Sequence, residues 1–209
     1  MVVVLAKLVV AYLLGSLSGS LLLGRLRGVD IRRHGSGNAG GTNALRVAGW
    51  RFALGVVAID VGKGALAAWI GADPNLRSGA LDAETLGVAC ALAAMVGHCW
   101  PVFFGFRGGK GAGTAVGGML VLAPWFAVAL FVVWITTIAM TRMVGLATVL
   151  AALAFPLLVF PAPLAGFATT PALQAFSLAV AVLIVFTHRA NLARLRRGEE
   201  PRLGRARTP

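Results

Sequence analysis

The amino-acid sequence predicts an all-α integral membrane protein with about seven transmembrane helices, some of them short or broken, joined by Gly-rich loops on the cytoplasmic side. Of 209 residues, 58% are hydrophobic and only 12% are charged, whereas soluble domains carry about 25% charged residues. Several apolar runs approach the roughly 20 residues that a helix needs to cross a bilayer. Arginines gather between and after these runs, as they do on the cytoplasmic side of membrane proteins. We therefore treat residues 1–209 as one polytopic domain with a mobile end at 203–209.

The first apolar run, from about Val2 to Leu23, is interpreted as a retained membrane span. It is longer than the apolar region of a signal peptide, carries only Lys7 as a charge and lacks a small-residue cleavage pattern. Near its end, pairs of small residues predict close contact with another helix, since association in lipid depends on tight packing. These pairs are Gly15 with Gly19 and Ser20 with Gly24. A place for Ser16 and Ser18 in a substrate site is the less favoured alternative.

Two charged residues, Asp60 and Lys63, interrupt the second predicted span, Phe52 to Ile70. Charges inside a membrane are costly, so such residues are either functional or paired. A spacing of three lets these two pair on one helix face. The preceding segment, Arg25–Arg51, holds six arginines against one acid and is predicted to be cytoplasmic. The following segment, Gly71–Glu84, has three acids against one arginine and fits the opposite side.

A third span is expected at about Thr85 to Phe103, and it places His98 near the cytoplasmic end. Structural hydrogen bonding and function are equally open for this histidine. The number of later spans depends on the run after Thr114. One span there gives six in total and puts the basic tail opposite the basic loop, whereas division at Pro124 gives seven and puts both inside.

We therefore expect four further helices, at Ala112–Leu122, Trp125–Met140, Val144–Phe160 and Leu173–Phe186. The first of these is too short to cross a bilayer. It is expected to be tilted, buried or re-entrant.

The segment Gly35–Arg46 is rich in glycines, hydroxyls and amides. Glycines allow positive φ, consecutive backbone N–H groups can form an anion-binding nest, and an arginine fork suits phosphate. A solvated turn between helices is the alternative. A second Gly-rich, basic segment, Gly97–Thr114, favours the first interpretation. Two such loops in one small chain predict one anionic site.

Several other chemistries are disfavoured. A net charge of +12 would suit nucleic acid, but the basic residues lie between and after apolar runs rather than on a soluble face. Gly108–Thr114 lacks the spacing of a nucleotide-binding phosphate loop. Neither a Gly-x-Ser-x-Gly motif nor a His-x-x-x-x-Asp pair predicts a catalytic triad. We expect no metal site, and Cys90 and Cys99 as small buried hydrophobic residues.

A basic segment, Thr187–Glu200, begins where the last span leaves the membrane. Such a segment more often sets topology or contacts anionic lipid than takes part in catalysis. That interpretation accounts for the arginines but not for His188, Asn191 and Glu200. His188 and Asn191 share a helical face with Leu195. We expect the three polar residues to complete a cytoplasmic site with the two Gly-rich loops.

Three blocks of the sequence resemble the PlsY family of bacterial membrane acyltransferases, which use acyl phosphate to acylate glycerol 3-phosphate. The blocks are Gly-Ser-Gly-Asn-x-Gly-x-Thr-Asn-x-Leu-Arg at 35–46, Gly-His-x-x-Pro-x-Phe at 97–103 with Gly-Gly-Lys-Gly at 108–111, and His-Arg-x-Asn-x-x-Arg-Leu at 188–195. Asp60-x-x-Lys63-Gly64 and Gly198-x-Glu200 also match, and the resemblance extends from residue 15 to about 202. The family commonly has Ala at 41 and Val at 112, where this chain has Gly and Ala. Neither departure removes a functional group.

The resemblance implies a seven-helix enzyme of the bacterial cytoplasmic (inner) membrane with its active site facing the cytoplasm. The implied reaction transfers an acyl group from acyl phosphate to the 1-hydroxyl of glycerol 3-phosphate. Its products are 1-acylglycerol 3-phosphate (lysophosphatidic acid) and phosphate, and it is the first acylation of phospholipid synthesis. The implied partners are these substrates and membrane lipid, with no cofactor, no metal and no nucleic acid, and the chain is expected to act as a monomer.

The matching positions supply the candidate site residues. Candidates for catalysis are Ser36, Arg46, Lys110, His188, Asn191 and Glu200. Candidates for substrate binding are Gly37, Asn38, Gly40, Thr42, Asn43, His98, Gly108, Gly109 and Gly111. We expect loop N–H groups to bind phosphate, and Arg46 and Lys110 to neutralise its charge. Asn43, Asn191 and His188 are expected to orient the glycerol hydroxyls or the leaving phosphate.

The proton of the acceptor hydroxyl has two candidate destinations, a protein base such as His188 or Glu200, or a phosphate oxygen of the substrate. Acids and histidines are scarce near the loops, so our hypothesis is that a phosphate oxygen of the substrate accepts the proton. A phosphate transporter is the main alternative function, disfavoured because the two halves show no convincing repeat. A lipid-binding scaffold is disfavoured by the Asn, Thr and His residues of the motifs.

Overall fold

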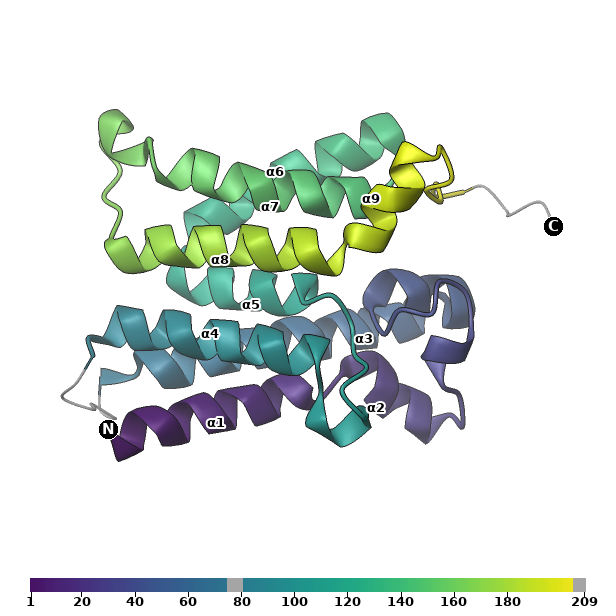
Figure 1. Ribbon diagram of the computed structural model, residues 1–209, viewed down its shortest axis with the longest axis horizontal. Coiled ribbons are helices and arrows are strands. Elements are labelled where there is room, and N and C mark those ends of the chain that lie inside the picture. The colour runs from purple at the N-terminus through teal and green to yellow at the C-terminus, as the bar shows by residue number, and fades with distance from the viewer. Residues whose placement is uncertain (75–80, 205–209) are drawn as a thin grey trace. The chain divides into compact units, whose positions relative to one another are not determined.

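The computed structural model describes residues 1–74 and 81–204, and these are helical with connecting loops (Figure 1). This confirms the all-α class. The chain divides into two compact units, Met1–Ala123 and Pro124–Pro209, which are described separately. The prediction of one domain over 1–209 stays a prediction.

Unit 1 comprises α1 (Val2–Ser16), α2 (Gly19–Leu26), the 3-10 helix η1 (Ile31–Arg33), α3 (Gly41–Ala72), α4 (Ala83–Cys99), the 3-10 helix η3 (Val102–Phe104) and α5 (Ala112–Leu122). Unit 2 comprises α6 (Pro124–Thr141), α7 (Val144–Val159), the 3-10 helix η4 (Ala162–Ala165), α8 (Pro171–Thr187) and α9 (Arg189–Arg196).

The first predicted span is broken into α1 and α2, which are bent by 50° and together can form one span. Two charged side chains of α3 bind the backbone groups at this break. Lys63 Nζ donates to the carbonyl oxygens of Gly15 (2.8 Å) and Leu17 (3.1 Å) at the end of α1. Asp60 Oδ1 accepts from the N–H of Gly19 (3.0 Å) at the start of α2. Each charge thus complements a helix dipole, and the two pair with each other at 3.0 Å as predicted.

Small residues place the helices of unit 1 in backbone contact, which confirms the predicted packing role of Gly15 and Gly19. A Cβ at Gly15 would collide with the backbone of Ala94 in α4, and Figure 1 shows α1 and α4 side by side. A Cβ at Gly19 would meet the carbonyl oxygen of Val56 in α3 at 2.8 Å. The short helix α5 packs on α3 in the same way, through Gly117, and its inner face is buried. One face of α5 is thus buried as expected, and its tilt or re-entry in a bilayer stays a prediction.

Helix α3 begins inside the segment that the sequence predicts to be a loop. Gly49, at φ 80° and ψ 177°, breaks it into two helical pieces and folds the first piece back. A Cβ at Gly41 would consequently meet Val57 Cγ2 at 2.8 Å. A buried cluster that includes Ile31, Ala44 and Phe52 holds this arrangement.

Unit 2 centres on α7. The ring of Phe155 packs against Phe126 of α6 and Phe176 of α8, with centroid distances of 6.1 Å and 5.8 Å. The bounds of α6, α7 and α8 agree with the predicted ones within two residues. The end of the chain is ordered further than expected, because the N–H of Leu203 donates to the carbonyl oxygen of Arg142 at 2.8 Å. The rest of the expected mobile end, residues 205–209, lies outside the described residues, as does Arg77 of the predicted outer loop.

Three helical segments in the described part of the chain are long and apolar enough to cross a membrane: α3, α4 continued to Phe104, and α6. The number rises to five if each bent pair, α1 with α2 and α8 with α9, forms one span. The apolar helices α5 and α7 are shorter. The expected total of seven stays a prediction.

Candidate functional site

The two Gly-rich loops of unit 1 lie against each other. A Cβ at Gly109 would meet the carbonyl oxygen of Ala39 at 2.6 Å and would collide with the ring of His98. The guanidinium of Arg32 joins the same two segments, since it donates to the carbonyl oxygens of Phe104 and Arg107, each at 3.0 Å.

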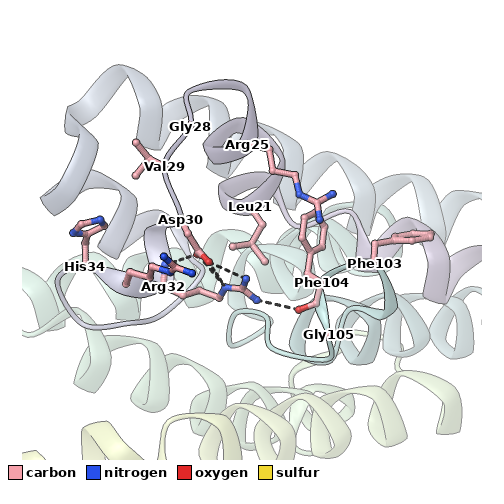
Figure 2. Close-up of a pocket in the computed structure, with 11 residues that line it drawn as sticks. Leu21, Arg25, Gly28, Val29, Asp30, Arg32, His34, Phe103, Phe104 and Gly105 are labelled. Carbon is pink, nitrogen blue, oxygen red and sulfur yellow. Dashed lines mark hydrogen bonds and ion pairs between the residues drawn. The ribbon is translucent and has the colours of Figure 1, made fainter.

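Asp30 holds that guanidinium in place through a 2.9 Å ion pair (Figure 2). The hydrogen bonds from the Arg32 side chain also keep the pKa of the Asp30 carboxyl below its usual value.

Asn43 shapes the first loop from inside. Its side chain is buried, its Oδ1 accepts the N–H of Ser36 at 2.9 Å, and its Nδ2 donates to the carbonyl oxygens of Ile31 and His34. Both amide hydrogens are therefore used within the loop. The expected role of Asn43 in orienting substrate stays a prediction.

Several backbone N–H groups of both loops are also used internally, and phosphate binding by the loop N–H groups stays a prediction. The N–H groups of Ser36, Gly37, Gly40, Gly108 and Gly109 donate to Asn43 Oδ1 and to the carbonyl oxygens of His34, Asn38, Cys99 and His98, respectively. The sequence shows where glycine frees the backbone, but not which acceptor its N–H will find.

Two helix N-termini supply further donors. The first N–H groups of a helix have no partner within it; these belong to Gly41 and Thr42 in α3, and to Ala112 and Gly113 in α5. The start of α3 lies against Val57, and a Cβ at Gly113 would lie 3.3 Å from that of Asp60, one turn further along α3. Both positive helix ends thus face the same part of α3, which favours an anion.

The remaining candidates of unit 1 lie near these helix starts in the sequence. Ser36, Gly37 and Arg46 are exposed, and Asn38, Gly40, Thr42, Gly108, Gly109 and Lys110 are half-buried. Lys110 directly precedes Gly111, the residue before α5, whose φ of 85° favours glycine. Polar groups and two cations accompany the two helix N-termini, which is a chemistry suited to phosphate.

His98 belongs to the charge network rather than to the exposed loop surface. Its buried ring places Nδ1 2.8 Å from Lys63 Nζ and 3.4 Å from Asp60 Oδ1. Its carbonyl oxygen accepts the N–H of Gly109. The structure therefore shows the structural hydrogen bonding that was one of the two open alternatives, and connects the broken helix with the second loop.

The three candidates of unit 2 lie at the junction of α8 and α9. His188 is buried with its Nδ1 2.8 Å from the carbonyl oxygen of Ile184, so Nδ1 carries the proton and Nε2 is the acceptor in the neutral ring. Asn191 Nδ2 donates to Glu200 Oε1 at 2.6 Å, and Arg194 Nε donates to Oε2 at 3.0 Å. Both carboxylate oxygens of Glu200 are therefore engaged.

Sequence reasoning missed two features. Arg32 was counted only as a basic residue, although its spacing from Asp30 was a signal for a local pair. Gly145 of α7 lies directly against Asn191 and Glu200, where a Cβ would collide, and nothing in its sequence context indicates this.

Comparison with known proteins gives the family. A family model described as glycerol-3-phosphate acyltransferase matches residues 5–198. The chain belongs to the glycerol-3-phosphate acyltransferase family. Relatives of that name from Chlorobaculum parvum and Chlorobaculum tepidum are 39% and 38% identical to it, each over 97% of this chain and 97% of the relative.

Solved structures of an integral membrane glycerol 3-phosphate acyltransferase, PlsY, are also similar. Its glycerol 3-phosphate form is 34% identical over 96% of each chain with a TM-score of 0.84. Its lysophosphatidic acid form gives 0.82 at 34% identity, over 96% of this chain and 95% of the other. The predicted PlsY resemblance is confirmed, and the protein is a multi-pass membrane acyltransferase of phospholipid synthesis.

Proposed function

We propose that this acyltransferase uses acyl phosphate as its donor and transfers the acyl group to the 1-hydroxyl of glycerol 3-phosphate at the cytoplasmic face of the bacterial inner membrane. The observation that carries this proposal is the meeting of two basic, Gly-rich loops and two helix N-termini in unit 1. Both reactants are phosphates, so the site must attract anions. The two forms of the similar solved enzyme, with glycerol 3-phosphate and with lysophosphatidic acid, support the acceptor and the product.

The reaction needs positioning more than it needs a strong nucleophile. The hydroxyl oxygen attacks the acyl carbon, the bond from that carbon to the phosphate oxygen breaks, and its electron pair leaves with phosphate. Because phosphate is a good leaving group, orientation and charge neutralisation suffice. We assign neutralisation to Arg46, Lys110 and the starts of α3 and α5, and polar contacts to Ser36, Asn38 and Thr42.

The glycines of the two loops permit a backbone shape that a side chain would disturb. Gly37 and Gly111 adopt positive φ, and Gly40, Gly108 and Gly109 lie against neighbouring backbone or side-chain atoms where a Cβ would collide. We assign them to binding through loop shape rather than through direct N–H contacts.

We propose that the hydroxyl proton passes to a phosphate oxygen of the substrate. Glu200 is a poor base in this structure, since both its oxygens accept hydrogen bonds. His188 and Asn191 are assigned to orienting hydroxyls or the leaving phosphate. The His188→Ala variant is expected to lose activity with an unshifted pH profile. Loss of a rate-controlling pKa near about 6–7 in that variant would instead make His188 the base.

The test of the whole proposal is phosphate release from palmitoyl phosphate by the purified protein in lipid, with and without glycerol 3-phosphate. We expect release that requires glycerol 3-phosphate and yields lysophosphatidic acid. Arg46→Ala and Lys110→Ala should each lower turnover by about 10²–10³-fold, and Arg27→Gln, a change of an exposed arginine outside the motifs, should not. Turnover with acyl-CoA but not with palmitoyl phosphate would refute the donor, and saturable transport without turnover would favour a transporter.

A further inference from the structure

A cavity of about 680 Å³ in unit 1 is separate from the candidate reaction centre. It lies between the segment Leu21–His34, which includes α2 and η1, and the segment Phe103–Gly105 (Figure 2). None of the candidate catalytic or substrate-binding residues lines it. Its chemistry therefore needs an explanation of its own.

The lining of the cavity carries uncompensated positive charge. Three arginines and one acid line it, and Asp30 pairs with Arg32. The guanidinium of Arg25 lies over the Phe104 ring, 4.5 Å from its centroid, as Figure 2 shows. Among the ion pairs of the described residues, neither Arg25 nor Arg33 has a carboxylate partner. A guanidinium without a carboxylate partner can bind a phosphate through two parallel N–H···O hydrogen bonds.

Apolar side chains line the cavity between and beside these arginines. Leu21, Val29 and Phe103 line it, and Phe103 is 47% exposed. Leu26, on the same short helix as Leu21, is 80% exposed. In a membrane protein, exposed aromatic and aliphatic side chains beside arginines are typical of the headgroup level of the bilayer. Free phosphate would contact only the arginines, whereas a lipid would contact both the arginines and the apolar side chains.

We propose that this cavity binds the phosphate headgroup of an anionic membrane lipid. Arg25 and Arg33 hold the phosphate, and the first carbons of the lipid chain lie along Leu21, Val29 and Phe103. This is a second anionic site, and it depends neither on the donor nor on the proton path proposed above.

The test uses dodecyl phosphate carrying a photoreactive diazirine on its chain, with the full-length protein in phosphatidylcholine nanodiscs. After illumination, mass spectrometry should locate adducts in the peptides that contain Leu21, Val29 and Phe103. In the double variant Arg25→Gln/Arg33→Gln, labelling of these cavity peptides should need about 25-fold more probe, about fivefold for each arginine. The matched control is Arg27→Gln, because Arg27 lies beside the same segment, over the Phe52 ring, and does not line the cavity.

Competition distinguishes lipid from free phosphate. Unlabelled dodecyl phosphate should displace the probe at far lower concentration than inorganic phosphate. Equal competition by dodecyl phosphate and inorganic phosphate would overturn the lipid assignment, because the apolar side chains would then contribute nothing to binding. Adducts confined to other peptides, or equal labelling of the double variant and the wild type, would overturn the site itself. Thermal unfolding of the double variant close to that of the wild type shows that lost labelling is not lost folding.

Discussion

Helices α3 and α6 have nearly the same hydropathy but opposite places in their units. Their most apolar windows have mean hydropathies of 1.6 and 1.8, and both helices are long enough to span a membrane. In α3, 39% of that window is buried; in α6 only 6% is, and Leu130 is its one buried residue. The sequence of α3 contains charges and several glycines, whereas α6 has neither. Polar and small residues, rather than hydropathy, identify the helix around which its neighbours pack.

The physical reason lies in the solvent. Lipid is as apolar as a protein core, so helix contact in a membrane depends on close packing and on polar groups that need partners. Helix α3 offers both, with Gly64 and Gly71 against neighbouring backbones and Asp60 and Lys63 at the broken helix. The apolar side chains of helix α6 are solvated by lipid as well as they would be by other side chains of the protein.

The largest effect is expected from Asp60→Ala. This change removes the carboxylate that pairs with buried Lys63 and that accepts the N–H of Gly19. It should cost about 3–5 kcal/mol of stability. Asp60→Asn keeps an acceptor for Gly19 and should cost less. The stability of both variants can be measured by thermal unfolding, with maleimide labelling of the buried free thiols Cys90 and Cys99 as the signal. A change below about 1 kcal/mol in Asp60→Ala would show that the network is not what holds α3.

One substitution made in both helices tests the comparison directly. Val56 of α3 is fully buried and Val132 of α6 is 55% exposed. Val56→Ala should destabilise by about 1–3 kcal/mol through lost packing. Val132→Ala should stay within about 0.5 kcal/mol. Thermal unfolding by circular dichroism in one detergent compares the two, and equal losses would contradict the comparison.

Two glycines of α3 provide a similar contrast. A Cβ at Gly64 would collide with the carbonyl oxygen of Thr114, whereas nothing lies within 4 Å of a Cβ at Gly62. Gly64→Ala should therefore cost about 1–3 kcal/mol. Gly62→Ala should stabilise the helix by up to about 1 kcal/mol, since alanine is the better helix former. The same thiol-labelling assay applies, and tolerance of Gly64→Ala would refute the close contact of α3 with α5.

A charge pair in a loop should matter least. The side chains of Asp30 and Arg32 are 31% and 28% exposed, so the pair should contribute about 0.2–1 kcal/mol. Because the folded state lowers the pKa of Asp30, this contribution is present above about pH 4 and is lost as the pH falls through the folded pKa. Unfolding temperatures of the wild type and Asp30→Asn should converge below that pH. If the difference in unfolding temperature between the wild type and Asp30→Asn grew on acidification, it would contradict the lowered pKa of Asp30.

The candidate site was predictable in its residues but not in its hydrogen bonds. The motifs place Ser36, Arg46 and Lys110 on two loops, and the structure brings those loops together. The pattern could not show that Asn43 and several loop N–H groups bond within the loops, because glycine-rich backbone admits many turns. Nor could it show that α3 starts at Gly41, since Gly, Thr and Asn there favour a loop and only packing against Ile31 and Phe52 overrides them.

The sequence by itself determined the membrane class, the family motifs and the bounds of α5 to α8. These depend on composition, on local hydropathy and on breakers such as Pro124, which act within a few residues. The tertiary structure alone decided where the first span breaks, which groups satisfy Asp60 and Lys63, and that Arg32 joins the two loops. Each of these depends on backbone or side-chain partners far away in the sequence, and local periodicity carries no information about which distant group a side chain will meet.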